Sequence, residues 1–80
     1  MKTIRIEYYA QLREQSGCNE ESISTSAATA HELYAELHRR HGFSMQARQV
    51  RVAVNDRFGD WQQPLADGDM VVFIPPVAGG

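Results

Sequence analysis

Apolar residues take every second position near the start of the chain, at Ile4, Ile6 and Tyr8. A period of two predicts a β-strand with one buried face. Residues 10–15 (Ala-Gln-Leu-Arg-Glu-Gln) are good helix formers, and this run stops at Ser16-Gly17. We therefore predict one or two helical turns closed by glycine, with Leu12 as their buried anchor.

A longer helix is predicted to begin at Thr29. Thr29 and Glu32 fit a capping box, in which the Thr hydroxyl accepts from the third helical N–H and the Glu carboxylate accepts from the N–H of Thr29 itself. Leu33 and Leu37 lie four residues apart on one stripe, and Gly42 follows as a left-handed cap. The same stripe is extended by Ala30, Tyr34 and His41.

Further strands are predicted at 21–25, where a hairpin with the first strand is expected, and at 50–54, where valine alternates up to an Asn-Asp turn. A short strand is predicted within residues 58–61, although Gly59 weakens this prediction. The unbroken apolar run 70–74 predicts a strand buried on both faces, or buried on one face and covered by a partner on the other. We expect Val71 and Phe73 to point inward. Pro75-Pro76 ends this strand, because neither proline can donate to a ladder.

This order of elements predicts an α+β domain of the β-grasp (ubiquitin-like) kind. A mixed sheet would carry one main helix across one face. The domain is expected to span residues 1–74, and residues 75–80 would form an extended C-terminal tail.

Composition narrows the classes of function. The hydrophobic share of 42% and the charged share of 22% are typical of a folded domain. With eight basic residues against ten acidic ones, the chain has no excess of positive charge that would bind phosphate groups. No nucleic-acid partner is therefore expected. Neither a secretory stretch nor a membrane-spanning run is present, and the single cysteine has no partner for an internal disulfide. We expect a cytoplasmic protein without a membrane partner.

Candidate catalytic motifs are weak. His31-Glu32 begins a zinc pattern, but Ala35 stands where the second histidine belongs. His38 and His41 fall on the last turn of the predicted helix, where positive charge favours the helix dipole, so we expect no metal site. Cys18 has no evident base beside it. The carboxylates at positions 56, 60, 67 and 69 stand in turn sequences, and no glycine-rich phosphate loop is present. We therefore expect no self-contained active site.

The end of the sequence remains as a candidate. Pro75-Pro76 favours extended geometry, and the four residues after it reach about 13 Å when extended. Gly79 and Gly80 lack β-carbons, which permits passage through a narrow channel. The alternative is an ordinary frayed end.

Two segments carry a resemblance to a known family. Residues 64–69 read Pro-Leu-Ala-Asp-Gly-Asp, and residues 73–80 read Phe-Ile-Pro-Pro-Val-Ala-Gly-Gly. Tyr-Ala-Gln-Leu-Arg-Glu at 9–14 and Ala-Val-Asn at 53–55 support them. The chain resembles the sulfur-carrier (small) subunits of molybdopterin synthase over essentially its whole length, and the Pro-Pro-Val-Ala-Gly-Gly ending is the most specific part.

The resemblance implies a chemistry for Gly80. An activating enzyme would use ATP to adenylate its carboxylate, and a sulfurtransferase donor would convert the adenylate into a thiocarboxylate. Residues Pro75, Pro76, Val77, Ala78 and Gly79 would thread into the large synthase subunit, which binds cyclic pyranopterin monophosphate and supplies the catalytic residues. The family implies a heterotetramer of two small and two large subunits, with no cofactor bound by this chain.

The open face of the sheet is a candidate partner interface if Tyr9, Phe58, Trp61 and Ile74 point that way. The alternative is that Phe58 and Trp61 cap one end of the core. Arg5 and Glu7 are charged where many relatives are apolar, so the contribution of the first strand to the interface is uncertain. Two other functions are open: a sulfur carrier for thiamine, cysteine or tRNA thiolation, and a ubiquitin-like protein modifier.

Overall fold

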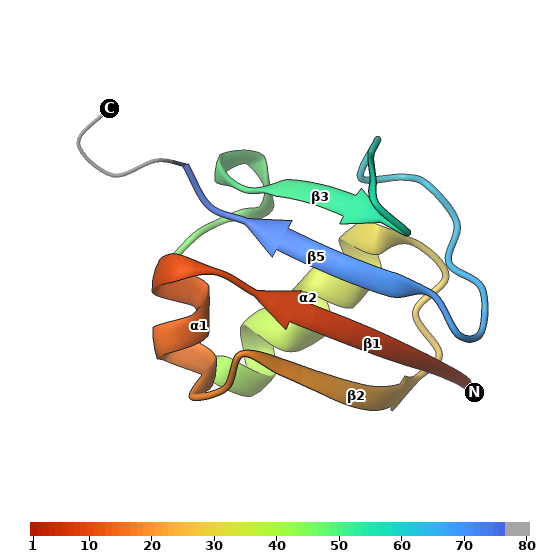
Figure 1. The fold of residues 1–80 in the computed structure, drawn as a ribbon, viewed down its shortest axis with the longest axis horizontal. Helices are drawn as coiled ribbons and strands as arrows, with labels where there is room; N and C mark the ends of the chain where they lie inside the picture. The colour runs from red at the N-terminus through yellow and green to blue at the C-terminus, as the bar shows by residue number, and fades with distance from the viewer. Residues whose placement is uncertain (77–80) are drawn as a thin grey trace.

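The computed structural model describes residues 1–76, so the expectations for Val77, Ala78, Gly79 and Gly80 lie outside the described residues. The elements in chain order are β1 (Lys2–Tyr8), α1 (Ala10–Ser16), β2 (Glu20–Thr25), α2 (Ala30–His41), the single 3₁₀ turn η1 (Ala47–Gln49), β3 (Arg51–Val54), β4 (Arg57–Phe58) and β5 (Met70–Ile74). The strand order in the sheet is β2-β1-β5-β3-β4. β1 and β5 run parallel, and the other neighbours run antiparallel. Helix α2 crosses one face of this mixed sheet (Figure 1), which confirms the predicted α+β β-grasp fold.

The core lies between the sheet and α2. Ile4 and Ile6 of β1 and Val71 and Phe73 of β5 are fully buried there, as the alternation predicts. The neighbouring β5 residues are only half-buried, because their side chains leave the opposite face of the sheet. Burial of β5 on both faces is therefore wrong, and Val71 and Phe73 point inward as expected.

Helix α2 begins and ends close to the predicted positions. The Thr29 hydroxyl accepts from the N–H of Glu32 at 3.2 Å, and Gly42 caps the other end with φ 69°. The reciprocal half of the capping box is wrong, because the Glu32 carboxylate accepts from Ala28 at 3.2 Å and not from Thr29. Residues before the helix run extended beside residues 63–65, and Leu65 donates to the Ala28 carbonyl at 3.0 Å. In that geometry the N–H of Ala28, one residue before Thr29, faces the Glu32 carboxylate.

Turn residues behave as their sequence indicates. Asn55 and Asp56 both have positive φ, 51° and 71°, which is the conformation of a tight two-residue hairpin between β3 and β4. The Asp67 carboxylate accepts from the N–H of Thr3 at 2.6 Å, and the Asp69 carboxylate accepts from the N–H of Ala66 at 2.8 Å. These carboxylates stabilise loops, as predicted.

No helix within residues 1–76 is long and apolar enough to cross a membrane.

Candidate functional site

The chain leaves the sheet from its central strand. β5 lies between β1 and β3 (Figure 1). It ends at Ile74, which is in register with Arg51 of β3. Pro75 is buried and Pro76 is exposed. Because proline has no N–H, neither residue extends the ladder. The C-terminal segment therefore departs at the middle of one sheet end, where both neighbouring strands and α1 surround its first residues.

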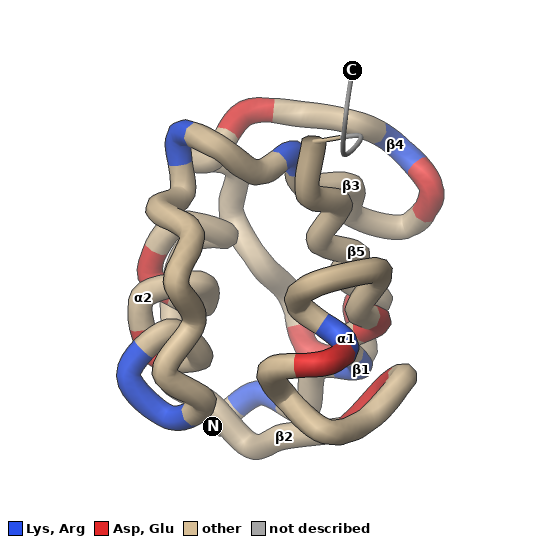
Figure 2. Tube along the Cα trace, turned by 90° about the vertical axis from the view of Figure 1, so that its left-hand side faces the viewer, with Lys and Arg blue, Asp and Glu red and all other residues tan. Residues whose placement is uncertain are grey.

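A groove of about 770 Å³ opens beside this exit. One wall is the start of α1, and the others are Met45 and the end of β5. Arg13 and Glu14 of α1 also line the groove, and Figure 2 shows basic and acidic colour next to each other on this helix. The lining residues are Tyr9, Ala10, Gln11, Arg13, Glu14, Met45, Ile74, Pro75 and Pro76. We call this cavity the exit groove.

Helix α1 is held firmly although it is short. Leu12 is fully buried, as predicted, and Gly17 closes the helix with φ 80°. The side-chain amides of Gln11 and Gln15 both donate to the Ser44 hydroxyl, at 3.1 and 3.0 Å. The wall of the exit groove is therefore preformed in the free protein.

The backbone is strained where α1 meets the groove. Ala10 has φ 52°, a left-handed conformation that costs a non-glycine residue about 1–2 kcal/mol. Tyr9, next to it, is 44% exposed, and its hydroxyl donates to Glu7 at 2.6 Å. That hydrogen bond and the charge of Glu7 raise the pKa of Tyr9. Strain of this kind clusters at functional sites, so its position at the exit groove supports a binding role for this region.

The sheet face opposite α2 carries an apolar strip. The register aligns Glu7, Val72, Ala53 and Phe58 across β1, β5, β3 and β4. Phe58 is 61% exposed, and Met70 and Ile74 extend the strip along β5. We call the set Met70, Val72, Ile74, Ala53 and Phe58 the open face. Ile74 belongs both to the open face and to the exit groove, so the two surfaces are continuous.

The four predicted interface residues are not all brought together. Tyr9 lines the exit groove, Ile74 joins both surfaces, and Phe58 lies on the open face. The placement of Trp61 with them is wrong. Its ring stacks on Phe73 at 5.8 Å between centroids with planes 10° apart, on the α2 side of the sheet.

The chain turns over the sheet edge between Phe58 and Trp61. The Asp60 carboxylate accepts from the N–H of Gln62 at 3.0 Å in that turn, and the Trp61 carbonyl accepts from the N–H of His31 at 2.8 Å. Capping of the core, the alternative interpretation, therefore fits Trp61 but does not fit Phe58.

Several surface residues were not singled out from the sequence. Met70 and Val72 follow from alternation once Val71 and Phe73 point inward, so that signal was available. Met45 stands in an irregular loop and Arg13 on a short helix, and neither position has a periodic pattern that marks it as part of a groove.

The remaining candidate groups do not form a reactive centre in the described part of the chain. Within residues 1–76 no three His, Cys, Asp or Glu side chains converge as metal ligands would. Cys18 is half-buried, with its sulfur 3.7 Å from the Ser16 hydroxyl. His31 and His38 each lie edge-on to an aromatic ring, of Trp61 and Tyr34 respectively.

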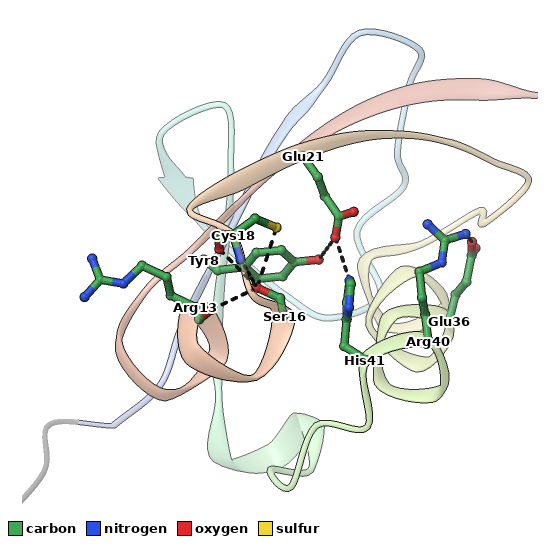
Figure 3. A network of polar contacts seen from close by, with 8 residues as sticks. All are labelled: Tyr8, Arg13, Ser16, Cys18, Glu21, Glu36, Arg40 and His41. Carbon is green, nitrogen blue, oxygen red and sulfur yellow. Dashed lines mark hydrogen bonds and ion pairs between the residues drawn. The ribbon is translucent and has the colours of Figure 1, made fainter.

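A buried polar cluster joins three elements near α1. The Tyr8 hydroxyl donates to the Glu21 carboxylate at 2.6 Å, and His41 Nε2 lies 2.7 Å from the same oxygen (Figure 3). Desolvation opposes ionisation of Glu21, but the hydrogen bonds from Tyr8 and His41, with the charges of His41 and Arg40, lower its pKa on balance. Burial and the bond to Glu21 raise the pKa of Tyr8. Only 15% of the His41 side chain is exposed, which agrees with its predicted place on the stripe of Leu33 and Leu37.

Comparisons with known proteins agree with this architecture. The model of the ThiS family matches residues 6–80. The molybdopterin synthase sulfur carrier subunit of Escherichia coli K12 is 31% identical over 80 residues, which are 96% of this chain and 99% of that protein.

Solved structures show the same fold. A Pyrococcus furiosus protein provisionally assigned as molybdopterin converting factor subunit 1 superposes with a TM-score of 0.79 at 30% identity, over 96% of this chain and 100% of that one. In the complex of subunits 1 and 2 of the Helicobacter pylori molybdopterin-converting factor, the matching chain has a TM-score of 0.69 at 28% identity, over 98% and 99%. In the Amycolatopsis orientalis BexX/CysO complex, the values are 0.69 and 27%, over 96% and 99%.

The family match extends from within β1 to β5 and the diglycine that follows, and the chain shares its length and fold with these relatives. The chain belongs to the ThiS family of ubiquitin-like sulfur carriers.

Proposed function

We propose that this carrier is the small subunit of a molybdopterin synthase, and that Gly80 carries the sulfur. The observation that carries the proposal is the 31% identity to the Escherichia coli subunit over nearly the full length of both chains. The Pyrococcus furiosus and Helicobacter pylori structures, at 30% and 28% identity, support the same assignment.

The proposed chemistry requires activation of a poor electrophile. The carboxylate of Gly80 attacks the α-phosphate of ATP on an activating enzyme, and pyrophosphate leaves. A sulfur nucleophile at the oxidation level of sulfide then attacks the acyl carbon, AMP leaves, and a thiocarboxylate remains. The large synthase subunit takes up this end and transfers the sulfur to its pterin substrate.

The geometry supports delivery as the role of this chain. β5 is anchored in the core through Val71 and Phe73, so the point of exit at Pro75 is fixed. The exit groove and the open face surround that point and offer apolar area to a docking protein. Residues 77–80 reach about 13 Å from Pro76 when extended, which is enough to enter a pocket in such a partner.

The test is intact mass spectrometry after incubation with the activating enzyme, ATP and a sulfur donor. The full chain should gain the mass difference of sulfur for oxygen on Gly80, and the loaded protein should then support dithiolene formation by the large subunit. A chain lacking Gly80 should do neither, whereas Ser24→Ala, on the exposed side of β2, should behave like the wild type. A loaded carrier that forms no dithiolene would refute the assignment to molybdopterin.

A second candidate is a sulfur carrier for another pathway. It is favoured by the 27% identity to a chain of the Amycolatopsis orientalis BexX/CysO complex. In that case the mass gain on Gly80 would still appear, and dithiolene formation would not. The same two measurements therefore separate the candidates.

A further inference from the structure

Arg51 lies on the same side of the sheet as the open face and next to it. It is the first residue of β3 and is in register with Ile74, the last residue of β5 before the exit. Its guanidinium carbon lies 5.1 Å from the centroid of the Phe58 ring. The arginine is therefore anchored between the exposed ring and the root of the C-terminal segment.

The ring orients the guanidinium without using its hydrogen-bonding capacity. A guanidinium stacked on an aromatic face still presents its N–H groups at the edge of the plane, where they can bind a carboxylate through two parallel hydrogen bonds. Among residues 1–76, the ion pairs are Arg5 with Glu20, Arg40 with Glu36 and His41 with Glu21, and Arg51 is not among them. Arg51 is exposed, oriented and available to a partner.

The charges around Arg51 differ from those at the opposite side of the open face. On β1, Glu7 accepts from Tyr9, and Arg5 pairs with Glu20. Both charged groups on β1 thus have a side-chain partner within the chain, whereas Arg51, on the side of the open face formed by β3 and β4, has no ion-pair partner among residues 1–76. A protein that covers this side must either supply a negative group or leave a guanidinium desolvated without a partner, which is strongly unfavourable.

We propose that Arg51 is part of the acceptor interface and binds a carboxylate that the acceptor presents over Phe58. This inference rests on the proposed function, because it assumes that an acceptor receives the end of the chain. Any protein that encloses residues 77–80 must lie within about 13 Å of Pro76. Ile74 is two residues before Pro76 and in register with Arg51 across the ladder, so an acceptor that also docks on the open face contacts Arg51.

The experiment measures binding of the loaded carrier to the large synthase subunit of the same organism by calorimetry at low and high salt. We expect Arg51→Glu to weaken binding at least about tenfold, and Arg51→Ala to weaken it less, because the reversal adds repulsion to the lost pair. Arg51→Lys should recover only part of the affinity, because an ammonium does not form the bidentate pair. The affinity of the wild type should fall with salt more steeply than that of Arg51→Ala.

Arg57→Glu is the matched control. Arg57 precedes Phe58 in β4 and is also exposed, but it is in register with Val54, so alternation directs it to the other side of the strand. Arg57→Glu makes the same change of charge as Arg51→Glu. We expect it to change the affinity for the large subunit by less than about twofold.

Four outcomes decide the question. Equal weakening by Arg51→Glu and Arg57→Glu, or wild-type affinity in Arg51→Glu, would overturn the role of Arg51 and leave the proposed function standing. Failure of the wild type to gain sulfur or to bind the large subunit would overturn the proposed function, and the role of Arg51 with it. The expected result is that Arg51→Glu weakens binding at least about tenfold and Arg57→Glu does not, with the mass gain on Gly80 retained in both.

Discussion

The two faces of β5 show how one strand serves two purposes. Val71 and Phe73 are fully buried against α2, whereas Met70, Val72 and Ile74 on the other face remain half-exposed although they are as apolar. Burial of an apolar side chain contributes about 25 cal/mol per Å² removed from water. The inner face has gained this free energy on folding, and the open face retains part of it, which is available for the proposed association with a partner. Under that proposal, stability and binding are separated by alternation within five residues.

The largest expected effect tests the inner face. Phe73→Ala should lower the free energy of unfolding by about 3–5 kcal/mol, because it leaves a cavity among Tyr34, Trp61 and the buried strand residues. Val72→Ala, one position away on the open face, should lower it by less than about 1.5 kcal/mol. Chemical denaturation of both variants gives the comparison, and equal losses would contradict the separation of the two faces.

Trp61 and Phe58 allow a second comparison between the inner face of the sheet and the open face. Trp61→Ala should lower the free energy of unfolding by about 2–3 kcal/mol, because the half-buried ring stacks on Phe73 and contacts Tyr34. Phe58→Ala should change it by less than about 1 kcal/mol but weaken binding of the partner, because the ring is 61% exposed. Thermal unfolding and titration with the partner are measured on both variants. They test whether Trp61 contributes to stability and Phe58 to binding. If Trp61→Ala weakened binding without loss of stability, Trp61 would belong to the partner interface after all.

A smaller effect is expected from pH at the cluster of Tyr8, Glu21 and His41. The folded protein lowers the pKa of Glu21 below its ordinary value of 4.5, so the unfolded chain binds this proton more readily. The carboxylate therefore stabilises the fold above about pH 4.5, and this contribution is lost as pH falls through the lowered pKa. Glu21→Gln should cost about 1–2 kcal/mol at pH 7, since an amide replaces the charged acceptor.

Denaturation between pH 3 and pH 7 tests the cluster. The wild type should lose its advantage over Glu21→Gln as the pH falls. A constant difference between the two proteins across this range would mean that ionisation of Glu21 does not contribute. Glu20→Gln is the matched control, because Glu20 is exposed and its pair with Arg5 contributes little.

The sequence was most informative where one residue type is nearly obligatory. Glycine at positions 17 and 42 accepts the positive φ that ends each helix, and proline at 75 and 76 ends the last strand. Alternation on β1 located the buried face, because a strand has only two sides. The helix start at Thr29 was also predictable, although the backbone N–H that the Glu32 carboxylate binds was not.

Which side chains lie on the surface, and on which side of the sheet, was harder to predict. Trp61 and Phe58 are only three residues apart in a segment with no period, and their rings lie on opposite sides of the sheet. His41 lies on the predicted apolar stripe, but nothing local indicates its contact with Glu21, from a strand twenty residues earlier. In both cases the side-chain environment depends on a distant element that no local pattern specifies.

The sequence by itself determined the order of the elements, the inward residues of β1 and β5, and a diglycine following two prolines, because each rests on local backbone chemistry or a period of two. The tertiary structure decided that β5 is central, that its exit meets α1 and Met45 in one groove, and that Arg51 lies over Phe58 beside Ile74. These features join residues far apart in the chain. They depend on strand order and register, which are set by the packing of the whole core.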